Sequence, residues 1–224
     1  MILWDRLDAG RQLVTALAQW RGANPLIFAI PRGAVPMGKV VAEGLSGELD
    51  VVLTRKLHAP GNPEFAVGAV DETGWSYIAD YAERAGATAE YLQREIAAQQ
   101  ETMRRRRAQY TPVRPPLDPA GRVAIVVDDG LATGATMVAA LHALRARQPR
   151  RLICAVPVAS LEAAALVRPH CDELVCLATP PGFYAVGQFY RDFRQVDDTE
   201  VIDLLRAAGA ASTPGASPPT SASS

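Results

Sequence analysis

The chain has 224 residues, of which 49% are hydrophobic, and its formal net charge at pH 7 is −1. This length fits one α/β domain with an insertion, and the nearly neutral charge gives no support for broad nucleic-acid or membrane binding. Aromatic residues make up only 6% of the chain, and this composition favours helices packed on a parallel sheet.

The sequence carries no sign of export or of membrane insertion. Residues 1–6 lack the long apolar run of a signal peptide, and no stretch approaches the roughly 20 apolar residues of a membrane helix. The three cysteines, Cys154, Cys171 and Cys176, have no CxxC spacing. We therefore expect buried thiols in a reducing compartment and a cytoplasmic protein.

The first quarter of the chain alternates amphipathic and short apolar segments. The pattern predicts, in chain order, a helix over 5–20, a strand over 26–30, a helix over 36–46 and a strand over 50–54. Arg32 and Gly33 follow the first strand, and Arg55 and Lys56 follow the second. Taken alone, each cationic pattern fits an exposed turn or a solvated strand end.

The pattern changes over residues 57–87, where prolines and glycines separate short alternating runs. This favours a hairpin-containing insertion outside the core. Residues 88–108 predict a long polar helix that ends in four arginines, Arg104–Arg107. Cations are favoured near a helix C-terminus, so we expect this run to be solvated; a phosphate or RNA contact is the alternative.

The α/β alternation resumes after a proline-rich connector. It predicts strands over 123–127, 151–156 and 173–177, and helices over 136–147, 160–168 and about 198–208. Residues 209–224 consist of Ala, Ser, Pro, Thr and Gly, and we expect them to form a disordered tail beyond a domain of residues 1–208. Strands that alternate with helices indicate a mostly parallel sheet covered on both faces.

The most informative segment is Asp128-Asp129-Gly130-Leu131-Ala132-Thr133-Gly134-Ala135-Thr136, which follows an apolar strand. Ligands of open α/β sheets bind at the carboxyl ends of strands. The glycines let a backbone approach a ligand closely, and the hydroxyls and helix-start amides can cradle a phosphate. Ribose hydroxyls or Mg²⁺ would relieve the repulsion between the two carboxylates.

Other interpretations of this segment carry no ligand. Thr136 could cap the helix, and the aspartates could accept hydrogen bonds from loop amides. The ordered combination of strand, paired acids, glycines and hydroxyls favours a phosphate site. The missing Gly-Lys-Ser/Thr excludes a Walker P-loop, and the missing GxGxxG excludes a dinucleotide fingerprint.

The segment 124–136 closely resembles the phosphoribosyl-diphosphate signature of type I phosphoribosyltransferases, and the resemblance extends over roughly residues 5–205. It implies a three-layer fold with a hood insertion. It also implies that Asp128 and Asp129 face the ribose hydroxyls, and that the 5′-phosphate lies on the loop of Gly130, Leu131, Ala132, Thr133, Gly134, Ala135 and Thr136. Residues 55–66 are similar to a bacterial subgroup of predicted phosphoribosyltransferases.

The resemblance also assigns a diphosphate site. Arg32, Gly33 and Ala34 match the family's pyrophosphate loop, and Arg55 and Lys56 lie where the family often places further cations. Such cations could neutralise a departing diphosphate, assisted by Mg²⁺. Ala34 stands where a second glycine is usual, and alanine would be strained there if the position required a positive φ.

The acceptor side departs from the family at Ala132. Members that act on 6-oxopurines usually carry an aspartate there that handles the base proton, so we do not expect hypoxanthine or guanine as substrates. By resemblance, Phe183, Tyr184 or Phe189 stacks on a nucleobase, and Asp192 joins Asp128 and Asp129 as a metal ligand. An aromatic cluster that seals the edge of the core explains the same residues equally well.

The sequence therefore predicts a Mg²⁺-dependent phosphoribosyltransferase that transfers ribose 5-phosphate to a nitrogenous base and releases diphosphate. Family members are commonly homodimers. The alternative is a non-catalytic regulator that senses phosphoribosyl diphosphate and binds RNA through the arginine run. The missing serine nucleophile elbow argues against hydrolase chemistry of its own. We assign no role to His58 or Glu64 from the sequence.

Overall fold

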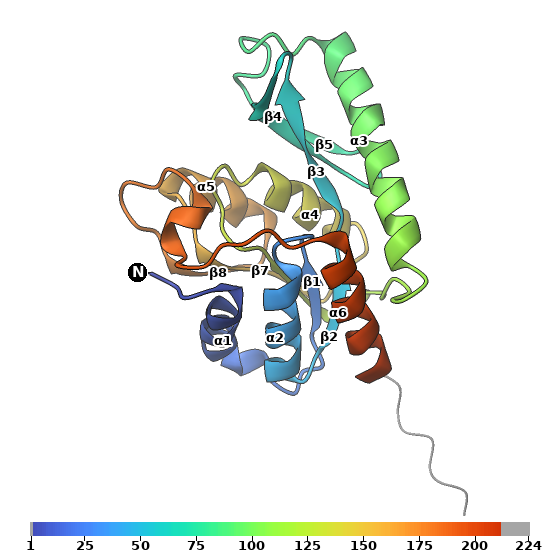
Figure 1. The fold of residues 1–224 in the computed structure, drawn as a ribbon, viewed down its shortest axis with the longest axis vertical. Helices are drawn as coiled ribbons and strands as arrows, with labels where there is room; N and C mark the ends of the chain where they lie inside the picture. Colours follow the sequence, from blue (N-terminus) through green and yellow to red (C-terminus); the bar gives the residue numbers. More distant parts are fainter. Residues whose placement is uncertain (1, 212–224) are drawn as a thin grey trace, which may run out of the picture.

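The centre of the protein is a five-stranded parallel sheet, as seen in a computed structural model that describes residues 2–211 (Figure 1). Its order is β2-β1-β6-β7-β8, and every neighbouring pair is parallel. The strands are β1 (Leu26–Ala29), β2 (Glu48–Val51), β6 (Val123–Val127), β7 (Arg151–Val158) and β8 (Glu173–Ala178). The predicted three-layer α/β fold is confirmed.

Helices cover both faces of this sheet because its strands are apolar on both sides. Ile27 and Ala29 face one buried cluster, whereas Leu26 and Phe28 face the other, as the alternation of a strand requires. The first cluster includes residues of α1 (Arg6–Ala16), α2 (Val35–Leu45) and α6 (Asp198–Ala211); the second includes residues of α4 (Ala135–Arg145) and α5 (Leu161–Val167).

The insertion forms a hood above the core (Figure 1). It is an antiparallel sheet of β3 (Thr54–Ala59), β4 (Asn62–Asp71) and β5 (Ser76–Ile78), with α3 (Ala89–Tyr110) packed along β3 and β4. The hood therefore begins before the predicted residue 57 and includes the long helix. As a consequence, Arg55 and Lys56 lie within a strand of the hood and not in the loop after a core strand.

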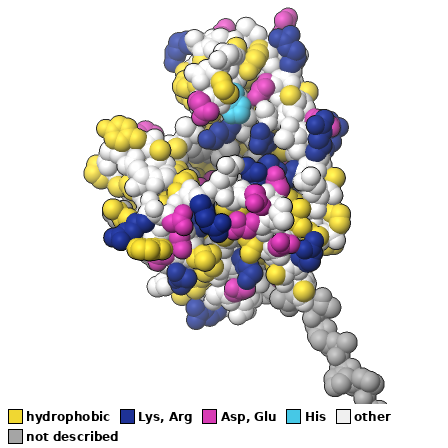
Figure 2. All heavy atoms as spheres, in the orientation of Figure 1, with side chains coloured by type: hydrophobic (Ala, Val, Ile, Leu, Met, Phe, Trp, Pro, Cys, Tyr) yellow, Lys and Arg dark blue, Asp and Glu magenta, His cyan; other side chains and the backbone are white. Residues whose placement is uncertain are grey.

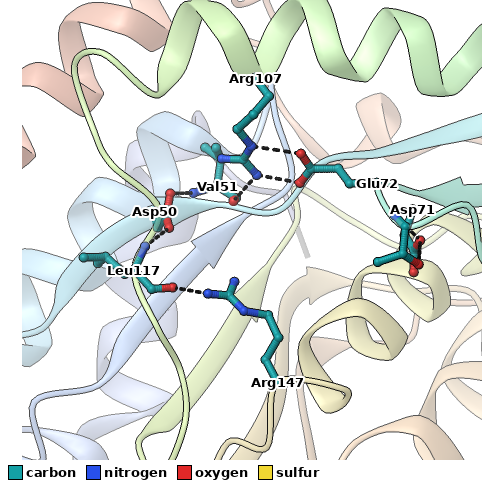
Figure 3. A network of polar contacts seen from close by, with 8 residues as sticks. Asp50, Val51, Asp71, Glu72, Arg107, Leu117 and Arg147 are labelled. Carbon is teal, nitrogen blue, oxygen red and sulfur yellow. Dashed lines mark hydrogen bonds and ion pairs between the residues drawn. The ribbon is translucent and has the colours of Figure 1, made fainter.

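The hood is tied to the core by the arginine run, which was predicted to be solvated (Figure 3). Arg107 donates two hydrogen bonds to Glu72, of 2.9 and 2.6 Å, and one of 3.3 Å to the carbonyl of Val51 in β2. Arg106 lies 3.4 Å from Asp198 of α6. The prediction holds only for Arg104 and Arg105, whose exposed side chains pair with Glu101 on the same helix.

The remaining boundaries differ by a few residues from the sequence pattern. Short 3₁₀ helices cover Ala18–Trp20, Arg168–His170 and Val186–Phe189. Helix α6 continues to Ala211, so the first three residues of the predicted tail are helical, and the rest of that tail lies outside the described residues. All three cysteines are free thiols; Cys154 is buried, and Cys171 and Cys176 are partly buried.

Candidate functional site

A cavity of about 1000 Å³ lies between the hood and the carboxyl ends of the core strands, and the predicted motifs line it. Figure 2 shows this hollow, with lysine and arginine atoms gathered beneath the hood. From the core, the lining includes Arg6, residues 30–33, residues 128–134, Thr136, residues 184–187 and Phe193; from the hood, it includes residues 54–56, His58, residues 64–66 and Tyr81. The tertiary structure thus brings the predicted loop, the acid pair and the cations into one cavity.

The paired acids stand at the end of β6, where the buried strand Val123–Val127 delivers them to the cavity. Asp128 and Asp129 are half-buried, and the amide of Asp129 donates a 2.9 Å hydrogen bond to Oδ1 of Asp128. Burial, followed by repulsion from Asp129, holds the pKa of Asp128 well above its ordinary range. Burial also raises the pKa of Asp129, against the opposing charge of Arg6. A ligand that supplies hydroxyl donors or positive charge would stabilise both carboxylates.

Arg6 is the partner of Asp129, and sequence reasoning missed it. Its Nε and Nη2 lie 3.2 and 3.0 Å from Oδ2 of Asp129, and its Nη1 donates a 2.7 Å hydrogen bond to the carbonyl of Arg194. The guanidinium also stands 4.0 Å above the ring of Phe193. Only the fold joins these residues, which lie 123 positions apart, because the first turn of α1 packs beside the end of β6.

Gly33 of the predicted pyrophosphate loop lies against this ion pair. A Cβ atom on Gly33 would come within 2.5 Å of Oδ2 of Asp129 and 3.2 Å of Nη2 of Arg6. The absence of a side chain is therefore required by the Arg6–Asp129 contact itself. The neighbouring peptide bond between Pro31 and Arg32 is cis.

The loop after the acids has the form expected of a phosphate cradle. Gly134 has a φ of 81° and begins α4, so its left-handed conformation requires glycine. Thr133 is exposed, Thr136 is half-buried in the first turn of α4, and both line the cavity, where first-turn amides have no acceptor within the helix.

Two residues of this loop have a packing role. Gly130 lines the cavity, but a Cβ there would come within 2.8 Å of Val186 and 3.0 Å of Val158, so glycine at this position is required by the protein's own side chains. Ala135 is buried at the start of α4 and is outside the cavity lining.

Three predicted cations meet at the cavity. Arg32 donates a 3.2 Å hydrogen bond to Asp198, and Nε of Arg55 donates a 2.9 Å hydrogen bond to Gln99, a neutral partner. Burial and then the positive charges of Arg106 and Arg32 lower the pKa of Arg55. Lys56 is exposed, and its charge acts on both carboxylates of the acid pair. Such crowding of cations is typical of a site for a multiply charged anion.

The strain anticipated at Ala34 is not present. Ala34 has a φ of −78° and a ψ of −10°, which any L-residue adopts, and it is buried at the N-cap of α2. The expectation depended on a positive φ, and the backbone does not require one. Ala34 is also outside the cavity lining, whereas Arg32 and Gly33 are part of it.

The aromatic segment divides between the cavity and the core. Tyr184, which is 91% exposed, lines the cavity, and so does Phe193, which was not among the predicted acceptor residues. Phe183 and Phe189 pack on each other with ring centroids 4.9 Å apart, and neither lines the cavity. Their sealing of the core edge is the alternative that the sequence left open.

The predicted metal ligands are only partly brought together. Oδ1 of Asp192 accepts a hydrogen bond from the amide of Arg194, and Asp192 lines a different cavity from Asp128 and Asp129. Within residues 2–211, no group of three or more His, Cys, Asp or Glu side chains is arranged to hold a metal ion. Any magnesium ion at the acid pair would therefore need ligands from substrate oxygens and water.

Comparison with known proteins agrees with this geometry. A family model described as a phosphoribosyl transferase domain matches residues 4–194, so the chain belongs to this family. A Mycobacterium tuberculosis protein named "Putative phosphoribosyl transferase Rv0571c" is 40% identical over 208 residues, which cover 91% of this chain and 46% of that protein. The chain thus spans about half the length of the curated relatives that it matches.

Solved structures share the fold. The crystal structure of TT1426 from Thermus thermophilus has a TM-score of 0.78 and 46% identity, and it covers 92% of this chain and 99% of its own. A hypothetical protein from Neisseria gonorrhoeae, solved with bound ppGpp, has a TM-score of 0.51 and 16% identity, with 92% and 96% coverage. The second likeness concerns the fold alone. In the part of the chain that the structure describes, no helix is long and apolar enough to cross a membrane.

Proposed function

We propose that this protein is a phosphoribosyltransferase that transfers ribose 5-phosphate from phosphoribosyl diphosphate to a nitrogenous acceptor. The observation that carries the proposal is the single cavity in which the acid pair, the loop 130–136 and the cations Arg32, Arg55 and Lys56 all meet. These three groups match the three parts of the donor, which are the ribose, the 5′-phosphate and the diphosphate.

The geometry supports a reaction that depends mainly on positioning and charge. The loop would hold the 5′-phosphate through amides and hydroxyls, and Asp128 and Asp129 would accept hydrogen bonds from the ribose hydroxyls. A ring nitrogen attacks C1 of the sugar, the bond from C1 to the diphosphate oxygen breaks, and the cations stabilise the departing charge. The hood would close the cavity against water.

Magnesium is part of the proposal. Mg²⁺ commonly binds through one or two carboxylates together with substrate phosphates and water, and two adjacent carboxylates with raised pKa values fit this pattern. Asp128 is the better candidate ligand, because Oδ2 of Asp129 is already held by Arg6. The ion would neutralise charge on the diphosphate.

The test is calorimetric titration of phosphoribosyl diphosphate with and without Mg²⁺. The comparison is between wild type and Asp128→Asn/Asp129→Asn, followed by a screen of nitrogenous bases for diphosphate release. We expect Mg²⁺-dependent binding to the wild type, a loss of at least about 100-fold in affinity in the double variant, and release that depends on an acceptor. A wild type that does not bind the donor would refute the proposal.

The same experiment separates the enzyme from a regulator. A sensor of phosphoribosyl diphosphate would bind the donor but release no diphosphate with any acceptor. The structure weakens the RNA-binding version of this alternative, because Arg106 and Arg107, half of the arginine run, are engaged with Asp198 and Glu72 inside the molecule.

A further inference from the structure

The hood contributes a histidine to the cavity that holds the proposed donor site. His58 of β3 lines the cavity, and its side chain is 26% exposed. Its Nδ1 lies 3.4 Å from Oε1 of Glu95, whose side chain on α3 is 17% exposed. Figure 2 shows histidine atoms beside the hollow on the hood. The negative charge of Glu95 beside Nδ1 favours the tautomer that carries its hydrogen on Nδ1, and in this tautomer Nε2 is the nitrogen with the lone pair.

The pair is held by further contacts. Gln99 donates a 3.0 Å hydrogen bond to Oε1 of Glu95, and the backbone amide of His58 lies 3.4 Å from the same oxygen. The hydroxyl of Tyr91 donates to the carbonyl of His58 at 2.9 Å. The strand at His58 is therefore fixed against α3, and the carboxylate of Glu95 is held beside the imidazole, as a positioned proton acceptor needs.

The same polar network reaches the diphosphate cations. Oε1 of Gln99, whose amide nitrogen binds Glu95, accepts the 2.9 Å hydrogen bond from Nε of Arg55. Glu95 and Gln99 are four residues apart on one face of α3, so one helix face positions both the cation and the histidine. The network thus joins the leaving-group side of the cavity to its hood side.

Transfer to a neutral acceptor requires a group that takes a proton. As the acceptor nitrogen forms its bond to C1 and diphosphate leaves with the bonding electrons, the N–H hydrogen of the acceptor must be transferred to a base. Ala132 has no group for this task, and Oδ2 of Asp129 is engaged by Arg6. Glu64 lines the cavity as well, but its exposed carboxylate has no ion-pair partner within residues 2–211 to orient it.

We propose that Nε2 of His58 accepts the proton of the attacking N–H group, and that Glu95 is a positioning residue for the imidazole. The substrate class is an acceptor whose attacking nitrogen carries a hydrogen at neutral pH. This inference rests on the proposed phosphoribosyl transfer. It assigns to the hood a chemical role in addition to covering the cavity.

The test compares His58→Ala, His58→Gln, Glu95→Gln and Glu64→Gln with two matched controls, His170→Ala and Glu101→Gln, which change a surface histidine and an outward carboxylate of α3. Binding of phosphoribosyl diphosphate with Mg²⁺ is measured first by calorimetry. Diphosphate release is then measured with adenine, hypoxanthine, uracil, orotate, nicotinate, anthranilate or water as acceptor, in the absence and presence of added imidazole.

We expect the His58, Glu64 and control variants to bind the donor within about twofold of the wild type, because none of these side chains is assigned to the donor. Glu95→Gln also changes the contact network of Arg55 through Gln99, so its kcat is measured at saturating donor. We expect kcat to fall by about 10²–10⁴ in both His58 variants, with an unchanged KM for the donor, and at least tenfold in Glu95→Gln. Imidazole should restore activity to His58→Ala, where it has room to bind, and not to His58→Gln. Such rescue would not follow from a structural role alone.

Several results would overturn the assignment while leaving donor binding intact. The first two are a wild-type kcat in His58→Gln and the absence of imidazole rescue in His58→Ala. The others are a larger loss of kcat in Glu64→Gln than in His58→Gln, and donor binding with no diphosphate release for any acceptor. A wild type that does not bind the donor would instead refute the proposed function itself.

Discussion

Replacement of Arg6 by methionine should destabilise the protein through Asp129. The side chains of this ion pair are only 10% and 17% exposed, and Arg6 supplies two of the nitrogens nearest to Oδ2 of Asp129. Removal of one partner from a buried ion pair costs about 3–5 kcal/mol. Because Asp129 has a raised pKa and can take up a proton, we expect the lower end, about 3 kcal/mol at pH 7.

The assay is a double-mutant cycle followed by urea and thermal unfolding. At about 2–4 °C of Tm per kcal/mol for a domain of this size, Arg6→Met should lower Tm by roughly 6–12 °C. Adding Asp129→Asn should restore part of this loss, with a coupling free energy of about 2 kcal/mol between the two positions. Arg6→Lys is the control, because it keeps the charge but not the planar two-nitrogen contact. Strictly additive effects would refute the importance of the ion pair.

Three further changes test other contacts. Gly33→Ala should lower donor affinity about tenfold and Tm by a few degrees, because the new methyl group displaces Asp129 by overpacking; unchanged calorimetry would contradict the loop geometry. The hydrogen bond from Arg145 holds the pKa of Asp172 below its ordinary value. The ionised Asp172 therefore stabilises the folded protein above about pH 4, and this stabilisation is lost as the pH falls through the folded-state pKa. Asp172→Asn should therefore cost about 1 kcal/mol at pH 7 and less at pH 3, and an equal cost at both pH values would disprove this linkage. Arg107→Met should cost about 2–3 kcal/mol of stability and increase hydrogen exchange in the hood, since it removes the contacts to Glu72 and β2; protection equal to that of the wild type would disprove the anchor.

Much of the fold follows from local sequence. The apolar run 123–127, the caps Asp5, Thr88 and Ser160, and Gly134 each act within a few residues, so their elements lie close to the predicted positions. The boundary of the hood was less accurate. Thr54 reads as the end of a buried strand, and only pairing with Asp71 of β4 makes it the start of a hood strand.

The aromatic and arginine segments show where local pattern fails. Phe183, Phe189 and Tyr184 are all aromatic, yet Phe183 packs partly buried on the buried Phe189, whereas Tyr184 is exposed at the cavity. Arg104 and Arg107 lie in one run, but Arg104 pairs with Glu101 of its own helix, whereas tertiary packing brings Glu72 to Arg107. Neither distinction is encoded within the segment itself.

The sequence by itself determined the alternation of strands and helices, the glycine-containing turn into α4 and the position of the paired acids at the end of β6. These depend on backbone propensity, apolar periodicity and turn chemistry over short distances. The tertiary structure alone decided that Arg6 holds Asp129, that Asp198 holds Arg32, and that Glu95 holds His58. Each of these contacts joins elements distant in the sequence, and a pairing of that kind exists only after the parallel sheet and the hood have packed together.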